Sequence, residues 1–385
     1  MDNRVAFIYS DAFLGYDFGK SHPLNPIRLL LTFRLIKDLG LLEREDVTLL
    51  EPEYATREDL LRVHTPEFID AVKSAGEGKL PRSPFIFTEF GLGYGDNPIF
   101  EGMYEASSLY VGASLKAARL IVEGDARRAF NISGGLHHAT ASRASGFCIF
   151  NDPAIAISYL KEHFERVMYI DIDAHHGDGV QWIFYDDPSV LTVSFHESGR
   201  YLFPGTGEID EIGEGKGKGY AVNIPLPRGT SDPAYLYAFG EIVPELAEVF
   251  EPGIVVTQLG ADTHFLDPLT DLSLTTRAYS EIGKMLDEIT QKLCDGRWLA
   301  LGGGGYDMTV VPRAWSIHFA RMVGLNPDYS IPEDWMRFCE NTIHRRPPRE
   351  LLDSETPGED PSILEEVRGV VEDVKRYHRA FFSDR

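Results

Sequence analysis

Residues 166–179 read RVMYIDIDAHHGDG, and this stretch decides the fold class of the chain. Its first half is an apolar run without alternating polar residues, which is typical of a strand covered on both faces. Its second half changes abruptly to carboxylates and histidines. We therefore interpret the stretch as a buried strand of a parallel sheet, with chemically reactive groups at its carboxyl end.

Five further apolar runs have the same character, being rich in Val, Ile, Leu and Phe and bounded by Gly, Asp or Pro. Helical patterns separate several of them, and such alternation is typical of a parallel sheet with helices on both faces. We predict an α/β fold, a single-domain open parallel sheet flanked by helices. The expected strands are Arg4–Ser10, Ala126–Ser133, Arg166–Asp171, Val190–His196, Gly253–Leu259 and Arg297–Leu301.

Four intervening stretches have apolar residues at about helical spacing. In one of them, Asp152 is the expected N-cap and Pro153 occupies the first helical position, where proline is well tolerated. The expected helices are Met103–Glu123, Pro153–Phe164, Asp232–Phe250 and Thr275–Leu293.

The chain has 385 residues, a length that an α/β domain can reach without a boundary. We expect residues 1–345 to form one catalytic domain. Residues 346–385 are interpreted as a linker, irregular from Pro347 to Pro361, followed by a charged amphipathic helix at Ser362–Phe382. We expect that helix to lie on the surface of the same domain.

The charge balance is strongly acidic, with 37 Lys and Arg against 60 Asp and Glu and a net charge of −23. Direct binding to nucleic acid is not expected, because phosphate contacts need Lys and Arg. An acidic surface attracts cationic partners such as Lys-rich peptides, although it also serves solubility alone.

The cysteines are three and far apart, which argues against a disulfide framework and for a reducing compartment. The N-terminal MDNRVAFIYSDAF lacks the pattern of a signal peptide. No apolar run approaches the roughly 20 residues of a membrane-spanning helix. We expect a soluble, cytoplasmic protein without membrane contact.

Chemically reactive polar residues follow four of the expected strands. His137 and His138 follow one strand, residues 171–175 close another, and Asp262 and the run Gly302–Tyr306 follow two more. Ligands bind at the carboxyl ends of strands in open parallel sheets. These four segments are therefore expected to direct their side chains to one rim.

The run after the central strand has the composition of a metal site. Alternate residues of an extended chain face the same way, so Asp171, Asp173 and His175 should share one side. A catalytic zinc site needs three protein ligands and an open position. Asp173 and His175 supply two ligands and Asp262 is the expected third, although such a site would also accept Fe2+.

The adjacent histidines His137 and His138 are candidates for a general base, which near neutral pH is most often His. A carboxylate behind a histidine commonly fixes its tautomer. We expect Asp171 to orient His137 and Asp178 to orient His138. The alternative, that both histidines are metal ligands, stays open from sequence alone.

Tyr306 follows four consecutive glycines, where its phenol could reach a substrate carbonyl and stabilise an oxyanion. A phosphate-binding loop is a poorer interpretation, because neither G-x-G-x-x-G nor a Lys-Ser/Thr pair is present. Phe147 and Phe203 lie in short loops and could form the walls of a narrow tube, or simply pack.

As a set, these motifs resemble the zinc-dependent histone deacetylases, and most closely the bacterial and archaeal acetoin-utilisation proteins. The motifs SGGLHHA, GFCIFNDPAIA, YIDIDAHHGDGVQ, TVSFH, FPGTGE, NIPLP, GAD and GGGGY occur in the family's order, and the likeness runs from about residue 5 to about residue 320. The resemblance implies an arginase-like α/β fold with one zinc ion at the base of an acyl-lysine tunnel.

The resemblance also assigns residue roles. It makes His138 the general base and acid, His137 its electrostatic partner and Tyr306 the group that binds the carbonyl oxygen. Asp173, His175 and Asp262 are the zinc ligands, and Arg28 lies at an internal acetate cavity. The implied substrate-binding residues are Asp96, Gly146, Phe147, Phe203, Leu269 and Gly304.

Family members also bind structural monovalent cations, K+ or Na+. An inner site would use groups of Asp171, Asp173, His175, Ser194 and Phe195. An outer site would use Phe184, Asp187, Val190 and Tyr220.

The implied reaction is hydrolysis of the amide of N6-acetyl-lysine to lysine and acetate. The implied partner is an acetylated protein or peptide, for which an acyl-CoA synthetase is one candidate. Acetylpolyamines and other small acetylated amines are the alternative within the family, but Leu269 is apolar where acetylpolyamine enzymes can carry a carboxylate.

Two functions outside this reaction class also fit parts of the pattern. A two-manganese ureohydrolase would need a second carboxylate close to Asp262, whereas the next one is Asp267, and it would leave His137 and His138 without a role. A non-enzymatic scaffold that binds acyl-lysine or metal would not need the complete catalytic set.

Overall fold

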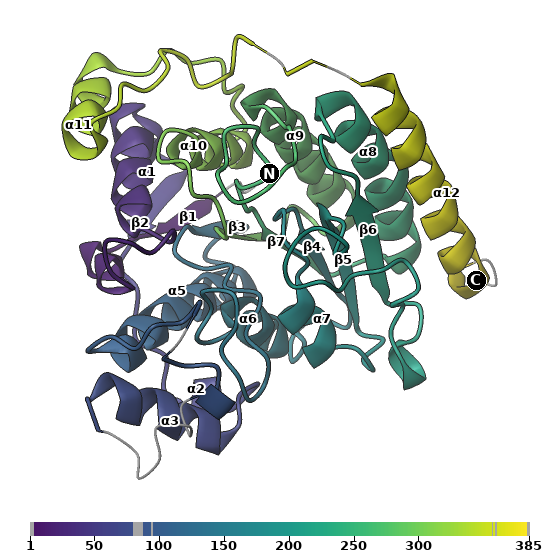
Figure 1. Ribbon diagram of the computed structural model, residues 1–385, viewed down its shortest axis with the longest axis horizontal. Coiled ribbons are helices and arrows are strands. Elements are labelled where there is room, and N and C mark those ends of the chain that lie inside the picture. Colours follow the sequence, from purple (N-terminus) through teal and green to yellow (C-terminus); the bar gives the residue numbers. More distant parts are fainter. Residues whose placement is uncertain (1–3, 80–87, 94, 356, 359, 383–385) are drawn as a thin grey trace.

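The computed structural model describes residues 4–79, 88–93, 95–355, 357–358 and 360–382. Its centre is a sheet of eight strands in the order β2-β1-β3-β8-β7-β4-β5-β6, and all neighbouring strands are parallel (Figure 1). Helices cover both faces of the sheet. The predicted fold class, an open parallel α/β sheet, is therefore confirmed.

The strands match the predicted apolar runs, with two additions at the edges of the sheet. Both additions are short or irregular in pattern: β2 is partly exposed, and β6 contains Pro225, which an edge strand tolerates. The strands are β1 Val5–Ile8, β2 Val47–Leu50, β3 Arg128–Asn131, β4 Val167–Asp171, β5 Val190–Glu197, β6 Ala221–Leu226, β7 Ile254–Gln258 and β8 Trp298–Leu301.

One layer of helices packs α1 against α10, α10 against α9, α9 against α8 and α8 against α12, while α5 and α6 cover the other face (Figure 1). No helix in the described ranges is long and apolar enough to cross a membrane. The helices are α1 Ile27–Asp38, α2 Arg57–Leu60, α3 Pro66–Gly76, α5 Met103–Glu123, α6 Asp152–Leu160, α7 Asp178–Ile183, α8 Asp232–Phe250, α9 Thr276–Leu293, α10 Val311–Met322, α11 Glu333–Ile343 and α12 Pro361–Phe382.

The predicted start of α6 was wrong by one residue. Asn151 is the N-cap, and its side chain accepts a hydrogen bond from the Ala154 N–H at 2.9 Å. Asp152 lies inside the first turn because its buried carboxylate has other partners, the N–H groups of Gly135 and Leu136 at 3.0 and 2.9 Å. This carboxylate fixes the loop that carries the paired histidines.

Complete burial of the central strands explains their unbroken apolar runs. Every residue of β3, β4, β5, β7 and β8 is buried. Because both faces are covered by helices, no position on these strands needs to be polar. Polar residues are therefore concentrated at the strand ends, where the chain leaves the core.

Register brings the strand ends to one edge of the sheet. Asp171 at the end of β4 pairs with Ser194 of β5 on one side and with Gln258 of β7 on the other. Gln258 in turn pairs with Leu301, the last residue of β8. The segments that follow β4, β7 and β8 therefore begin at the same level along the strand direction.

The segment between α11 and α12 is irregular but anchored. Leu351 is fully buried and Asp353 is 9% exposed. The Leu351 N–H donates to the Tyr329 carbonyl at 3.0 Å, and the Ile331 N–H donates to the Arg349 carbonyl at 2.7 Å. Helix α12 then packs on α8 and on the edge strand β6 (Figure 1).

Two helical glycines provide a stability test of this packing. A Cβ at Gly112 in α5 would lie 1.8 Å from the Glu53 carbonyl oxygen, whereas a Cβ at the exposed Gly240 in α8 would meet nothing within 4 Å. Gly112→Ala should lower the free energy of unfolding by about 1–3 kcal/mol through overpacking. Gly240→Ala should raise it by up to about 1 kcal/mol through helix propensity. Urea unfolding of both variants measures this, and equal effects would contradict the packing described.

Candidate metal centre and active site

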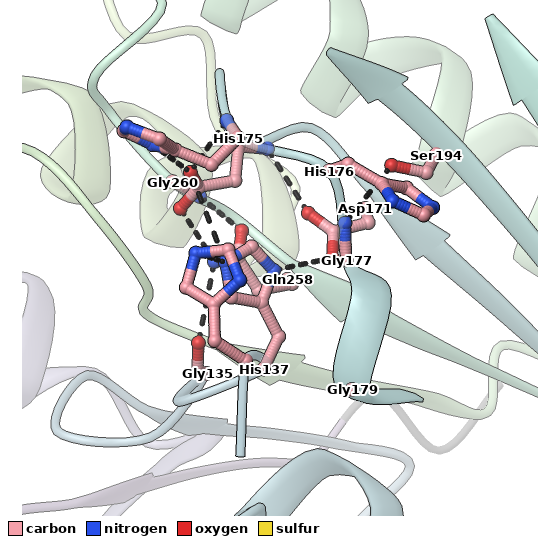
Figure 2. Close-up of polar contacts among 12 residues, drawn as sticks. Gly135, His137, Asp171, His175, His176, Gly177, Gly179, Ser194, Gln258 and Gly260 are labelled. Atoms are coloured by element: carbon pink, nitrogen blue, oxygen red, sulfur yellow. Dashed lines mark hydrogen bonds and ion pairs between the residues drawn. The ribbon is translucent and has the colours of Figure 1, made fainter. Parts of the chain in front are cut away.

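The candidate site lies where the segments after β3, β4, β7 and β8 meet. The segment after β3 carries His137, the segment after β4 carries His175, and β7 itself ends at Gln258 (Figure 2). Tyr306 follows β8. The structure thus brings together the four segments that the sequence predicted would share one rim.

Asp173, His175 and Asp262 form a compact group able to hold a metal ion. Their ligand atoms lie within 4.8 Å of one another, and all three residues are buried. The Nδ1 atom of His175 lies 3.0 Å from Asp173 Oδ1 and 3.1 Å from Asp262 Oδ2. Among the residues that the structure describes, this is the one His/Cys/Asp/Glu group with such geometry.

The negative charge of the two carboxylates in this group favours binding of a cation. Burial and the negative charge of Asp173 raise the pKa of Asp262 to about 6. Burial opposes a charged His175, but its hydrogen bonds to the carboxylates of Asp173 and Asp262 raise its pKa well above the usual value. A proton on His175 thus offsets one of the two negative charges, and a divalent cation could take over that role. Two carboxylates and one imidazole suit zinc with an open position, or Fe2+.

Neighbouring groups hold the carboxylates in place. Asp173 Oδ2 accepts hydrogen bonds from Gln258 Nε2 at 2.6 Å and from the Gly304 N–H at 2.8 Å. Asp262 Oδ1 accepts one from the Ala174 N–H at 2.8 Å. Such outer partners orient metal ligands. A side chain at Gly304 is excluded, because its Cβ would lie 2.1 Å from Asp262 Oδ2.

The paired histidines have the carboxylate partners expected from the sequence. His137 Nδ1 lies 2.7 Å from Asp171 Oδ2, and His138 Nδ1 lies 2.7 Å from Asp178 Oδ1. The two Nε2 atoms face each other at 3.0 Å. With Nδ1 of each ring held by a carboxylate, neither histidine belongs to the three-residue metal group.

The two rings differ in charge. Burial alone would lower the pKa of His137, but Asp171 and Asp173 raise it to about 9. Burial and the positive charge of His137 lower the pKa of His138 to about 4. At neutral pH His137 is therefore protonated and His138 is neutral, so His138 is the ring that can accept a proton.

Aromatic side chains surround the approach to these groups. The Phe203 ring lies 5.0 Å from the His138 ring, and the Phe147 ring lies 5.8 Å from the Tyr306 ring. A Cβ on Gly146 would lie 2.4 Å from the His138 ring, so only glycine fits there. Burial raises the pKa of Tyr306 well above its usual value, which keeps the phenol protonated.

Two cavities extend the site inward. One, with a volume of about 20 Å3, is lined by residues that include His138, Asp173 and Tyr306. The other, also about 20 Å3, shares Leu24, Arg28 and Leu136 with it. Arg28 donates to the carbonyl oxygens of Gly303 and Gly305 at 2.7 and 3.1 Å. Each cavity has room for about one water molecule.

Two of the outer residues predicted from the resemblance, Asp96 and Phe203, share a surface hollow. Asp96 is exposed and, with Phe203, lines a surface hollow of about 280 Å3. Leu269 is half-buried, and its N–H donates to Asp267 Oδ1 at 3.0 Å.

The residues predicted for monovalent cations are also near one another. For the inner site, Asp171 and Ser194 are register partners on adjacent strands, and Phe195 follows Ser194 (Figure 2). For the outer site, the Asp187 N–H donates to the Phe184 carbonyl at 3.0 Å and the Val190 N–H to the Asp187 carbonyl at 3.3 Å. The Tyr220 carbonyl accepts from the Thr192 N–H at 2.9 Å.

Several supporting residues give no functional signal in the sequence. Gln258 ends an apolar strand and gives no signal of its own before the neighbouring strand is known. Asp267 is buried, and its carboxylate accepts the Tyr306 N–H at 2.8 Å. His64 Nε2 accepts the Asn151 N–H at 2.9 Å, and Asn151 donates to the His137 carbonyl at 3.0 Å.

The model of the histone deacetylase domain matches residues 22–322. The acetoin utilization protein AcuC of Bacillus subtilis (strain 168) is 49% identical over 332 residues, which cover 86% of this chain and 85% of that protein. The chain belongs to the histone deacetylase family. The AcuC protein of Staphylococcus aureus (strain MRSA252) is 40% identical over 338 residues, 87% of this chain and 86% of that protein.

Solved structures of the same family agree with the fold. The crystal structure of a histone deacetylase homolog from Aquifex aeolicus superposes with a TM-score of 0.86 at 34% identity, covering 97% of this chain and 100% of that one. A histone deacetylase homolog complexed with SAHA gives the same values. Membership of the family makes this chain a deacetylase-type amidohydrolase.

His64 supports the histidine loop through Asn151, and its contribution to the free energy of unfolding can be tested by varying the pH. Burial lowers the pKa of His64 to about 4, against about 6.5 in an unfolded chain. Between these values the unfolded state binds the extra proton, so the stability due to a neutral His64 is complete above about pH 6.5 and is lost as the pH falls toward about 4.

We expect His64→Gln to make the free energy of unfolding fall less steeply with acidification, by up to about 1.4 kcal/mol per pH unit in that window. Urea unfolding at several pH values measures the slope. His163→Gln, at an exposed histidine, is the matched control. Equal slopes for His64→Gln and the unaltered chain would show that His64 is not held neutral.

Proposed function

We propose that this chain is a zinc-dependent deacetylase that hydrolyses the amide of N6-acetyl-lysine to lysine and acetate. The main support for this proposal is that a neutral histidine, His138, lies beside the buried group of Asp173, His175 and Asp262. Zinc is the ion that suits two carboxylates, one imidazole and an open position, and Fe2+ is the alternative. The predicted K+ or Na+ sites would be structural.

Each residue of the site has a separate role in the proposed reaction. When bound, zinc would polarise the acetyl carbonyl and acidify a water molecule. Neutral His138 accepts the proton of the attacking water and later gives it to the leaving lysine amine. The Tyr306 hydroxyl donates to the developing oxyanion. Protonated His137, held by Asp171, keeps positive charge next to His138.

The entrance suits a thin, flexible side chain. Phe147 and Phe203 flank the route to the histidines, and an alkyl chain can lie between such rings while its charged or polar backbone stays in solvent. The net charge of −23 favours basic partners such as Lys-rich segments. An acetylated protein or peptide is therefore the proposed substrate, and an acyl-CoA synthetase is one candidate in the cytoplasm.

A small acetylated amine is the alternative substrate. Leu269 is half-buried and offers no charge to a polyamine, which makes this the second choice. A two-manganese ureohydrolase is not proposed, because both oxygens of Asp267 accept backbone N–H groups, from Leu269 and Tyr306.

Acetate release from an acetyl-lysine peptide, by metal-stripped protein with and without added zinc, tests the proposal. His138→Ala should reduce kcat by about 10²–10⁴-fold because it removes the proton carrier. Tyr306→Phe should reduce it by about 10²–10³-fold because it removes an oxyanion donor. Tyr377→Phe, at an exposed tyrosine of α12, should leave kcat unchanged.

Release that is independent of zinc, or near-normal turnover in both active-site variants, would contradict the proposed roles. Hydrolysis of acetylpolyamines in preference to the peptide would retain the chemistry and replace the substrate.

A further inference from the structure

The C-terminal segment His344–Asp353 contacts two loops of the candidate site. It lies beyond residues 22–322, the part of the chain that matches the family model. One of its contacts is to Asp307, directly after Tyr306, and another is to His264, two residues after Asp262. A segment outside the matched region thus reaches the residues that flank a proposed catalytic group and a proposed metal ligand.

The contact to Asp307 is a bidentate ion pair. Arg345 Nη1 and Nη2 donate to Asp307 Oδ2 and Oδ1 at 2.8 and 3.0 Å, and Nη2 also donates to Thr309 Oγ1 at 2.7 Å. Asp307 Oδ1 accepts the Thr309 N–H at 2.8 Å as well. The Asp307 side chain is 6% exposed and that of Arg345 is 51% exposed. Arg345 therefore closes the turn that joins Tyr306 to α10.

The residues before Tyr306 are held through their backbone alone, by Arg28 at the Gly303 and Gly305 carbonyls and by Asp173 at the Gly304 N–H. Gly302–Gly305 have no side chains to pack, and Gly303 and Gly305 have φ of 128° and 122°, values that favour glycine. The Tyr306 N–H is held by Asp267 at 2.8 Å. The next side chain along the chain is Asp307, and its partner is Arg345.

Asp353 fixes the position of the segment relative to both loops. Its carboxylate accepts from Arg313 Nη1 at 2.7 Å and from Thr276 N and Oγ1, both at 2.9 Å. His264 Nε2 lies 2.9 Å from the same carboxylate. These partners come from α10, α9 and the loop after β7, so Arg345 is attached to a segment that is itself held by the core.

We propose that Arg345 is a positioning residue for Tyr306: through Asp307 it holds the turn after β8 in the conformation that presents the phenol to the metal group. The proposal rests on the proposed deacetylase function for its catalytic consequence. It does not rest on that function for its structural consequence, which is restraint of residues 302–310.

Arg345→Gln and Arg346→Gln form a matched pair. The two arginines are adjacent and 51% and 53% exposed, but among the described residues the ion pair of Arg346 is with Glu333, at 3.7 Å. Misplacement of a reacting group by about 1 Å can cost up to about 10²-fold in rate. We expect Arg345→Gln to lower kcat by about tenfold with KM changed less than about twofold, and Arg346→Gln to change neither.

A double variant separates positioning from a general loss of structure. If Arg345 acts through the phenol, Arg345→Gln added to Tyr306→Phe should cause no further loss of kcat, because there is no hydroxyl left to position. Losses that multiply would overturn the proposal.

Hydrogen exchange gives a readout that needs no activity. We expect amides in residues 302–310 to exchange at least about tenfold faster in Arg345→Gln than in Arg346→Gln, with the rest of the chain unchanged. Unchanged exchange in residues 302–310 would overturn the proposal, whatever the substrate. Faster exchange in a chain that hydrolyses no acetyl-lysine substrate would retain it and refute the proposed function alone.

Discussion

The structure depends on the burial of carboxylates at one edge of a parallel sheet. Asp171, Asp173, Asp178 and Asp262 are each at most 8% exposed. A buried charge is costly unless it is paired or binds a metal. Histidines supply the pairing for Asp171 and Asp178, while Asp173 and Asp262 share His175 and form with it a group that could hold a metal ion. The fold buries these carboxylates, and their need for positively charged or hydrogen-bonding partners determines the composition of the site.

This balance links architecture to chemistry. The carboxylates behind the histidines set different charges on neighbouring rings, because His137 lies near Asp171 and Asp173 whereas His138 lies next to a charged ring. A neutral histidine beside a group that could hold a metal is one arrangement suited to amide hydrolysis. The glycines after β8 let the backbone approach the metal group closely, and the loss of side-chain packing there is offset by contacts from Asp267 and from the C-terminal segment.

Much of this was predictable from the sequence, because the informative signals are local. Strands buried on both faces are mostly apolar, and in RVMYIDIDAHHGDG the reactive residues follow the strand directly. What was missed depends on strand order or on distant segments. Gln258 supports Asp173 because β7 lies beside β4, and the Asp353–His264 contact spans 89 residues. The N-cap of α6 was misplaced because Asp152 is engaged by a distant loop.

We propose that Asp173, His175 and Asp262 hold a single catalytic metal ion. Anomalous diffraction from crystals grown with zinc, recorded on both sides of the zinc absorption edge, would locate it. We expect one peak per chain at the centre of these three side chains, absent from an Asp262→Ala variant. Two peaks bridged by the carboxylates, or a peak bound by His137 and His138, would contradict it.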